Sequence, residues 1–88
     1  MPSKDVCVVL CTTPIGESER ISTELVERQL AACVNIINNV RSVYRWEGKV
    51  TTDTECLLII KTPRLAVDRL REALVSLHPY EVPEILSL

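Results

Sequence analysis

The side chains with the most distinctive chemistry are four cysteines and one histidine, because thiols and imidazoles are ligands that copper and zinc prefer in proteins. These residues are Cys7, Cys11, Cys33, Cys56 and His78. No Cys-x-x-Cys pair occurs among them, so their spacing is not typical of a structural zinc site. Cys7 and Cys11 can still join His78 in three dimensions, and sulfur with imidazole is a suitable donor set for copper.

The cysteines also have a simpler interpretation, in which a strand cysteine is a small apolar core residue. We expect that role for Cys7, Cys33 and Cys56, whereas Cys11 lies near the end of its strand beside a polar loop and has the better claim to a function. Cys7 and Cys11 are four residues apart in an expected strand, which separates their Cα atoms by about 13 Å and prevents a disulfide. Since the sequence starts without a secretory signal, we expect reduced thiols.

His78 is followed by the rigid segment PYEVP at residues 79–83. Its expected place at the end of a helix suits a capping role, because the helix dipole favours a protonated imidazole there. A capping role and a metal- or ligand-binding role are both open for this side chain. A cysteine nucleophile with His78 as its base is a further alternative, and no other catalytic pattern stands out in the sequence.

The composition indicates one small, mildly acidic domain spanning residues 1–88. Its 12 acidic and 10 basic side chains give a net charge of −2, and its aromatic residues are only Tyr44, Trp46 and Tyr80. Neither property suits a phosphate backbone or a base-stacking surface, so nucleic acid is not an expected partner. The apolar runs are too short to span a membrane, and with no signal peptide we expect a cytoplasmic protein.

Hydrophobic periodicity predicts four extended segments and two helices. The strands are expected at residues 5–13, 33–44, 49–60 and 82–88, and the helices at residues 18–32 and 62–78. Ser18 and Thr62 are the predicted N-caps of the two helices. The order strand, helix, strand, strand, helix, strand is typical of the ferredoxin-like α+β fold, βαββαβ, also called a split βαβ.

A long β-hairpin is predicted between the second and third strands. Its turn is expected at Glu47 and Gly48, where glycine supplies the positive φ of a tight turn. Asn38 and Asn39 indicate a bend or bulge in the strand that leads to it. The hairpin tip should project into solvent as an arm.

Two of the strands are apolar on both faces, at residues 6–11 and 55–61. Two helices cover only one face of a four-stranded sheet, so the second face needs another cover. We therefore expect a homo-oligomer in which another copy buries that face, and the hairpin at residues 41–52 is a natural arm for reaching a neighbour.

Several sequence pieces resemble those of one known family. They are VVLCTTP at residues 8–14, LAACVNI at 30–36, VYRWEGK at 43–49, IIKT at 59–62 and LHPYEVPEIL at 77–86. In this order, and over essentially the whole length, they resemble the CutA divalent-cation tolerance family. The resemblance implies a ferredoxin-like subunit in a tight homotrimer, similar in architecture to the PII signalling proteins, that binds a ligand and is not an enzyme.

The resemblance also implies sites. In bacterial members copper is assigned to positions that match Cys11 and His78, although Leu77 stands where some members have a second histidine. Other residues match positions that the family places around inter-subunit clefts, namely Cys33, Asn35, Trp46, Glu55, Lys61, Tyr80 and Glu81. The function implied first is a cytosolic homotrimer that binds copper or other divalent cations and contributes to metal tolerance.

An alternative function is a PII-like sensor or scaffold. Its inter-subunit cleft, near Lys61 and Tyr80, would bind a small anion or a partner protein. Within that cleft Lys61 is expected to neutralise either Glu55 or an anionic ligand. Trp46 is expected either to anchor packing between subunits or to stack on a ligand.

Overall fold

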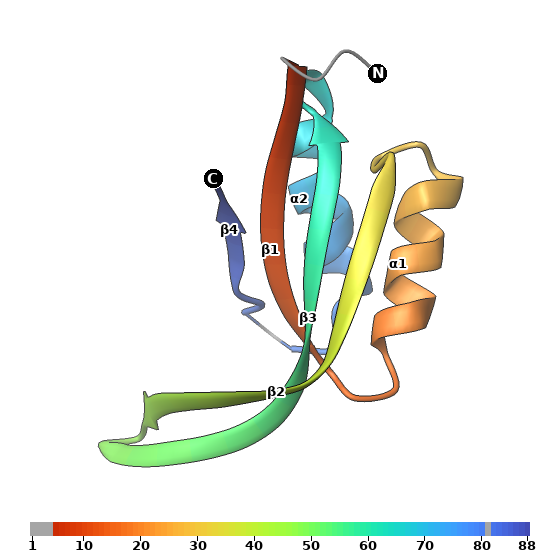
Figure 1. Ribbon diagram of the computed structural model, residues 1–88. Coiled ribbons are helices and arrows are strands. Elements are labelled where there is room, and N and C mark those ends of the chain that lie inside the picture. Colours follow the sequence, from red (N-terminus) through yellow and green to blue (C-terminus); the bar gives the residue numbers. More distant parts are fainter. Residues whose placement is uncertain (1–4, 81) are drawn as a thin grey trace.

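The computed structural model describes residues 5–80 and 82–88. Its elements are β1 (Val6–Pro14), α1 (Ser18–Glu27), β2 (Cys33–Trp46), β3 (Lys49–Pro63), the short 3-10 helix η2 (Arg64–Ala66), α2 (Val67–Leu77) and β4 (Ile85–Ser87). Figure 1 shows them in chain order, and the strand and helix order matches the predicted one. The predicted α+β class is therefore confirmed.

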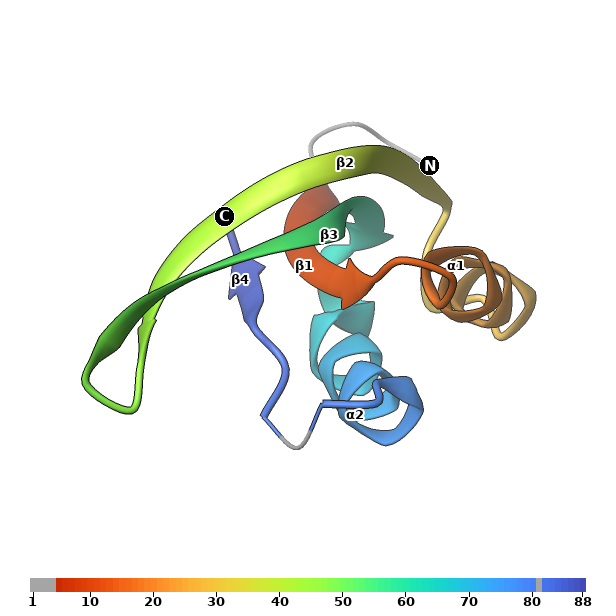
Figure 2. The ribbon, with the colours of Figure 1, turned by 90° about the horizontal axis from the view of Figure 1, so that it is seen from below.

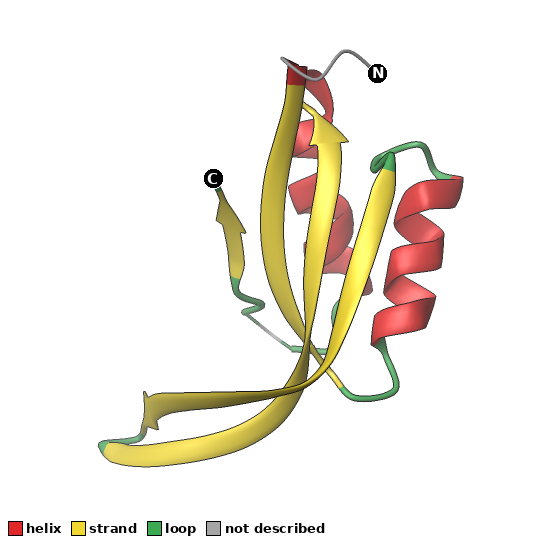
Figure 3. Cartoon of the chain, viewed as in Figure 1, coloured by secondary structure: helices red, strands yellow, loops and turns green. Residues whose placement is uncertain are grey.

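The four strands form one antiparallel sheet in the order β2-β3-β1-β4. This is the order of a split βαβ, in which the first and third strands are central. Both helices lie on the same side of the sheet (Figure 3). As expected from the sequence, two helices therefore cover one face only.

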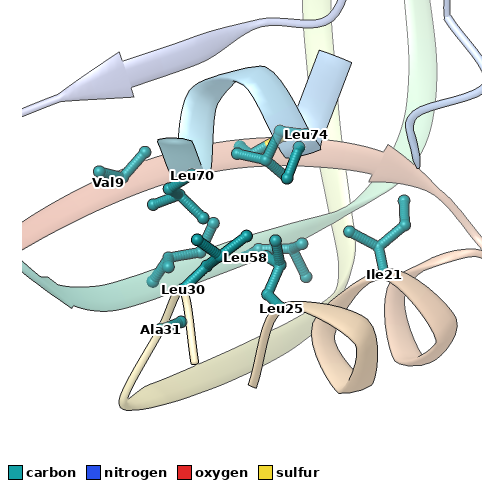
Figure 4. Close-up of a cluster of buried hydrophobic side chains, with 11 residues drawn as sticks. Val9, Ile21, Leu25, Leu30, Ala31, Leu58, Leu70 and Leu74 are labelled. Atoms are coloured by element: carbon teal, nitrogen blue, oxygen red, sulfur yellow. The ribbon is translucent and has the colours of Figure 1, made fainter. Parts of the chain in front are cut away.

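The core lies between the two helices and this face of the sheet. Figure 4 shows Leu25 of α1 and Leu70 of α2 meeting Leu58 of β3. The cluster of buried side chains consists of Val9, Cys11, Ile21, Leu25, Leu30, Ala31, Leu58, Ile60, Leu70, Ala73 and Leu74. Every member is aliphatic or a thiol, so the core contains no aromatic ring.

The other face of the sheet is also apolar. Burial alternates along β1, so that Val9 and Cys11 face the helices while Leu10 points to the other side, where it is half-buried. Leu10 is paired with Ile59, and Leu57 lies two residues from Ile59 on the same side of β3. Coverage of this face by a second copy remains a prediction.

Beyond the sheet, β2 and β3 continue together as a bent arm (Figure 1). The pairing register shifts between Ile37 and Val40, and Asn39 has φ of 60°, so the predicted bulge is confirmed. The turn residues Glu47 and Gly48 have φ of 50° and 78°. Positive φ at both positions is the geometry of a type I′ turn, in which the predicted role of Gly48 is confirmed.

The first helix ends earlier than predicted, at Glu27 instead of residue 32. Gln29 has φ of 60°, and the N–H groups of Gln29 and Leu30 donate to the carbonyls of Val26 and Leu25. These are the two bonds of a Schellman ending, a motif usually marked by glycine. Because glutamine occupies the position where glycine is usual, the sequence contains no local signal for this helix end.

The helix starts also differ from the predictions. Ser18 is the first residue of α1 and makes no capping bond. Thr62 belongs to β3, where its hydroxyl donates to the Leu30 carbonyl at 2.6 Å, and α2 begins only at Val67. The last strand is shorter than expected, because it begins at Ile85 after Pro83. No helix in residues 5–80 and 82–88 combines the length and hydropathy needed to cross a membrane.

Candidate functional site

A pocket of about 460 Å³ lies where the arm leaves the sheet. Its lining residues come from three strands and from the connection between α2 and β4: Thr12, Tyr44, Trp46, Asp53, Glu55, Tyr80, Val82 and Glu84. We call it the arm pocket. Figure 2 shows the bent arm and the α2–β4 connection, the two parts of the chain that flank it.

The register of the hairpin brings the strand residues of the pocket to one face. Tyr44 is paired with Thr51, and Asp53 and Glu55 follow Thr51 at intervals of two. Since side chains alternate between faces along a strand, Tyr44, Asp53 and Glu55 point to the same side. This is also the side that the helices leave open, so the pocket faces away from the core.

The arm pocket is strongly acidic. Three carboxylates line it, from Asp53, Glu55 and Glu84, and among the described lining residues none is basic. Tyr44 donates its hydroxyl hydrogen bond to Asp53, and Tyr80 donates to Glu55 at 3.1 Å. The phenols therefore stabilise these carboxylates without neutralising them.

The carboxylates perturb both tyrosines. Burial and the hydrogen bond to Glu55 raise the pKa of Tyr80 to about 12. The hydrogen bond to Asp53 raises the pKa of Tyr44 above its usual value. Both shifts mean that an additional negative charge is disfavoured in this pocket.

We expect the ultraviolet absorbance change of tyrosine ionisation to occur above pH 10 in the folded protein. Tyr44 and Tyr80 are the two tyrosines of the chain, so the whole signal is displaced. The folded state keeps these protons longer than the unfolded state, so stability falls as pH rises from about 10 toward 12. The guanidinium-unfolded chain is the control and should titrate near pH 10. A folded protein that titrates with this control would contradict the described geometry.

His78 links the α2–β4 connection to the C-terminal end of β1. Its Nδ1 accepts the backbone N–H of Tyr80 at 3.1 Å, so Nε2 carries the hydrogen and donates to the Thr12 carbonyl at 2.7 Å. The ring does not cap α2. Instead, Arg20 donates from Nη2 to the Leu77 carbonyl at 2.9 Å and closes that helix end. Both imidazole nitrogens are thus engaged in structural bonds.

Cys11 precedes Thr12 on β1, and its side chain is turned into the core. Its side chain is 1% exposed, and its Sγ donates to the same Thr12 carbonyl at 3.6 Å. Burial, followed by the charges of Glu55 and Glu84, raises the pKa of the thiol to about 12. A thiol nucleophile needs the opposite shift. No group of three or more metal-binding side chains occurs within residues 5–80 and 82–88.

The predicted cleft residues separate into two groups. Trp46, Glu55 and Tyr80 meet in the arm pocket. Cys33 is paired with Lys61, which lies six residues after Glu55 on β3. This pair is therefore about 20 Å from Glu55 along the strand. Lys61 therefore does not neutralise Glu55 within one chain, and Asn35 lies with it at that far end of the sheet. Glu81 lies outside the described residues.

The remaining thiols are free. Cys7 and Cys56 are buried as expected, and Cys56 donates to the Asn38 side chain at 3.3 Å. Cys33 is exposed in the chain, so the predicted core role is wrong for it.

Five pocket residues are absent from the sequence-based candidates, namely Thr12, Tyr44, Asp53, Val82 and Glu84. A signal for two of them exists in the hairpin turn. Once Glu47 and Gly48 are taken as a two-residue loop, the register is fixed and Tyr44 and Asp53 share a face. Thr12, Val82 and Glu84 are brought in by tertiary contacts that no local pattern reveals.

Comparison with known proteins identifies the family. The family model described as CutA1 divalent ion tolerance protein matches residues 7–88. The chain belongs to the CutA1 divalent ion tolerance family. The Divalent-cation tolerance protein CutA of Thermus thermophilus is 51% identical over 82 residues, which cover 92% of this chain and 80% of that protein.

Solved CutA1 structures confirm the fold. The Thermus thermophilus Cut A1 structure superposes with a TM-score of 0.90 at 48% identity, covering 94% of this chain and 82% of that one. The structure of the PII-like protein CutA from Nostoc superposes with a TM-score of 0.89 at 36% identity, covering 93% and 78% of the two chains. The predicted likeness of the fold to PII-like proteins is therefore confirmed.

Members of the CutA1 family differ in length and location. The chloroplastic CutA 1 of Oryza sativa is 48% identical over 92% of this chain, which spans 46% of that protein. The Archaeoglobus fulgidus structure is described as a periplasmic CutA. A shared CutA1 fold therefore does not assign one compartment.

Proposed function

We propose that the chain binds a divalent cation at the arm pocket and contributes in this way to divalent ion tolerance. The observation that carries the proposal is the pocket's charge, because its described ionisable lining is made of carboxylates and phenols. Such a concentration of negative charge attracts cations, and carboxylate oxygens are ligands for hard divalent ions. The printed names of the relatives, divalent-cation tolerance proteins, support the same function.

Copper held by Cys11 and His78 is the narrower form of the proposal. The two side chains bond to the same carbonyl, that of Thr12, which also lines the arm pocket. A thiolate and an imidazole are suitable ligands for copper. Cu²⁺ also binds a given protein site more tightly than the other first-row divalent ions generally do. Coordination there requires Cys11 to lose a proton and His78 to release one of its bonds, so it should strengthen as pH rises.

Calorimetric titrations of the reduced protein with Cu²⁺, Zn²⁺ and Mn²⁺ test both forms. The double variant Asp53→Asn, Glu84→Gln removes two charges of the pocket, and Cys11→Ser, His78→Gln removes the soft donors. We expect the first variant to weaken binding of all three ions by at least about tenfold. The copper form predicts that the second variant selectively loses Cu²⁺ binding.

Light scattering should first show that both variants keep the assembly state of the parent protein. Titrations that give no saturable binding, or binding unchanged in the first variant, would remove the arm pocket as the cation site. Copper binding unchanged in the second variant would remove Cys11 and His78 as its ligands.

We further propose that the protein works as a cytoplasmic homotrimer that binds its ligand without turnover. The apolar face opposite the helices, with Leu10, Leu57 and Ile59, supports burial against other copies. Light scattering at micromolar concentration tests the assembly, and a monomer would contradict it.

A PII-like sensor of a small anion is the second candidate function. The exposed Lys61 at the far end of the sheet supports it, whereas the carboxylates of the arm pocket would repel an anion there. Phosphate titration of Lys61→Gln against the parent tests it, and equal affinities would reject it.

A further inference from the structure

All aromatic residues of the chain gather around one pocket. The sequence has three, Tyr44, Trp46 and Tyr80, and each of them lines the arm pocket. None belongs to the core cluster, which is entirely aliphatic apart from a thiol. Trp46 is 62% exposed and both tyrosines are 39% exposed. Burial in the core therefore does not account for the position of these rings, although the Tyr80 ring also contacts the His78 ring, with the two ring centroids 4.7 Å apart.

The pocket is also larger than a metal ion needs. Its volume of about 460 Å³ compares with roughly 30 Å³ for one water molecule. Pockets of roughly 300 to 1,000 Å³ are typical of sites for small organic molecules. The volume thus leaves room for a ligand with a carbon skeleton.

The charge of the pocket selects among organic ligands. The hydroxyls of Tyr44 and Tyr80 are turned to Asp53 and Glu55, so these tyrosines offer a ligand their rings. Aromatic faces attract organic cations through the ring quadrupole, and nearby carboxylates add attraction for the same charge. An anionic ligand would meet repulsion from three carboxylates, and a neutral one would gain nothing from them.

We propose that the arm pocket binds an organic ammonium group, alkylated on nitrogen, between the rings of Tyr44, Trp46 and Tyr80. The proposal shares the acidic lining with the proposed cation function and depends in addition on the rings, which a bare metal ion does not need. Quaternary ammonium ligands are the group that such aromatic lining recognises in proteins.

Choline and tetramethylammonium are the probes, and 3,3-dimethylbutan-1-ol is the neutral control because it has the shape of choline without its charge. Trp46 is the single tryptophan, so its fluorescence reports directly on the pocket. We expect saturable fluorescence changes with both cations, at roughly millimolar dissociation constants or tighter, and affinity for the neutral alcohol lower by at least about tenfold.

Variants of Tyr80 separate the ring from its hydroxyl. Tyr80→Leu should weaken choline binding by at least about fivefold, whereas Tyr80→Phe keeps the ring and should stay within about twofold of the parent. Calorimetry with the variant Trp46→Leu, which lacks the reporter, should show a loss like that of Tyr80→Leu.

The two proposals fail in different ways. Absence of choline binding at about 10 mM probe would exclude a dissociation constant in the millimolar range or tighter, and it overturns the ammonium site. Equal binding of choline and the neutral alcohol also overturns it. Choline binding that is unaffected by loss of the rings also overturns it. Loss of metal binding with retained, ring-dependent choline binding rejects the metal function alone.

Discussion

Replacement of Leu58 by alanine is expected to lower the free energy of unfolding by about 3 to 4 kcal/mol. Leu58 is 0% exposed and lies on β3, between β2 and β1, where it contacts the cluster formed with both helices (Figure 4). Removing its three outer carbon atoms leaves a cavity that neighbours on a central strand cannot fill by moving. The loss combines the lost burial of apolar surface with the empty volume.

Leu65→Ala is the matched control for this substitution. It makes the same chemical change on η2, where the side chain is 93% exposed, and should alter stability by no more than about 0.5 kcal/mol. Urea unfolding at one fixed protein concentration measures both, because assembly makes stability depend on concentration. Equal effects of the two substitutions would contradict the described core.

Replacement of His78 by alanine should cost about 2 to 3 kcal/mol even in the absence of any metal. The ring is buried and satisfies two backbone groups, the Thr12 carbonyl and the Tyr80 N–H. Alanine leaves the Tyr80 N–H unpaired and leaves the Thr12 carbonyl with only the weak thiol donor of Cys11. An unpaired buried group costs about 1 to 3 kcal/mol. Urea unfolding in the presence of a chelator isolates this structural contribution.

His78→Gln is the corresponding control. Its amide N–H can still donate to the Thr12 carbonyl, so we expect it to recover about half of the loss. This is also why glutamine replaces His78 in the metal titrations, where a collapsed pocket would imitate a lost ligand. If alanine leaves the unfolding curve unchanged in chelator, the ring does not hold the connection to β1, and a ligand role becomes its simplest explanation.

The fold could be predicted from the sequence because its signals are local and agree with one another. The paired strands on either side of Gly48 fix the hairpin, and the spacing of Leu70 and Leu74 identifies the second helix. The apolar character of β1 and β3 on both faces also predicts which strands are central. These features depend only on neighbours in the sequence.

The helix boundaries depend on contacts that the sequence does not display. Gln29 adopts a left-handed conformation without being glycine, because Leu30 is drawn into the core beside Leu25. Thr62 resembles an N-cap, but its hydroxyl is used by the Leu30 carbonyl across 32 residues. At both positions tertiary contacts outweigh the conformational preference of the local sequence.

The candidate site was only partly predictable for the same reason. The family resemblance named Cys11 and His78 as one metal site, but no residue pattern indicated that both side chains bond to the Thr12 carbonyl. Tyr80 and Glu55 meet in the pocket, whereas Lys61 lies far along the same strand. Which residues converge is set by the path of the α2–β4 connection, and no residue pattern encodes that path.

The hairpin arm beyond the bulge at Asn38 and Asn39 has a thermodynamic consequence. It is a two-stranded ribbon without helices on either side, and such ribbons are only marginally stable alone. Its backbone amides should therefore exchange with solvent hydrogen faster than those of the central strands. Because Tyr44 and Asp53 stand on this ribbon, any ligand that joins them to the α2–β4 connection also restrains the arm. Occupancy of the pocket and local order of the arm are thereby coupled, so each strengthens the other.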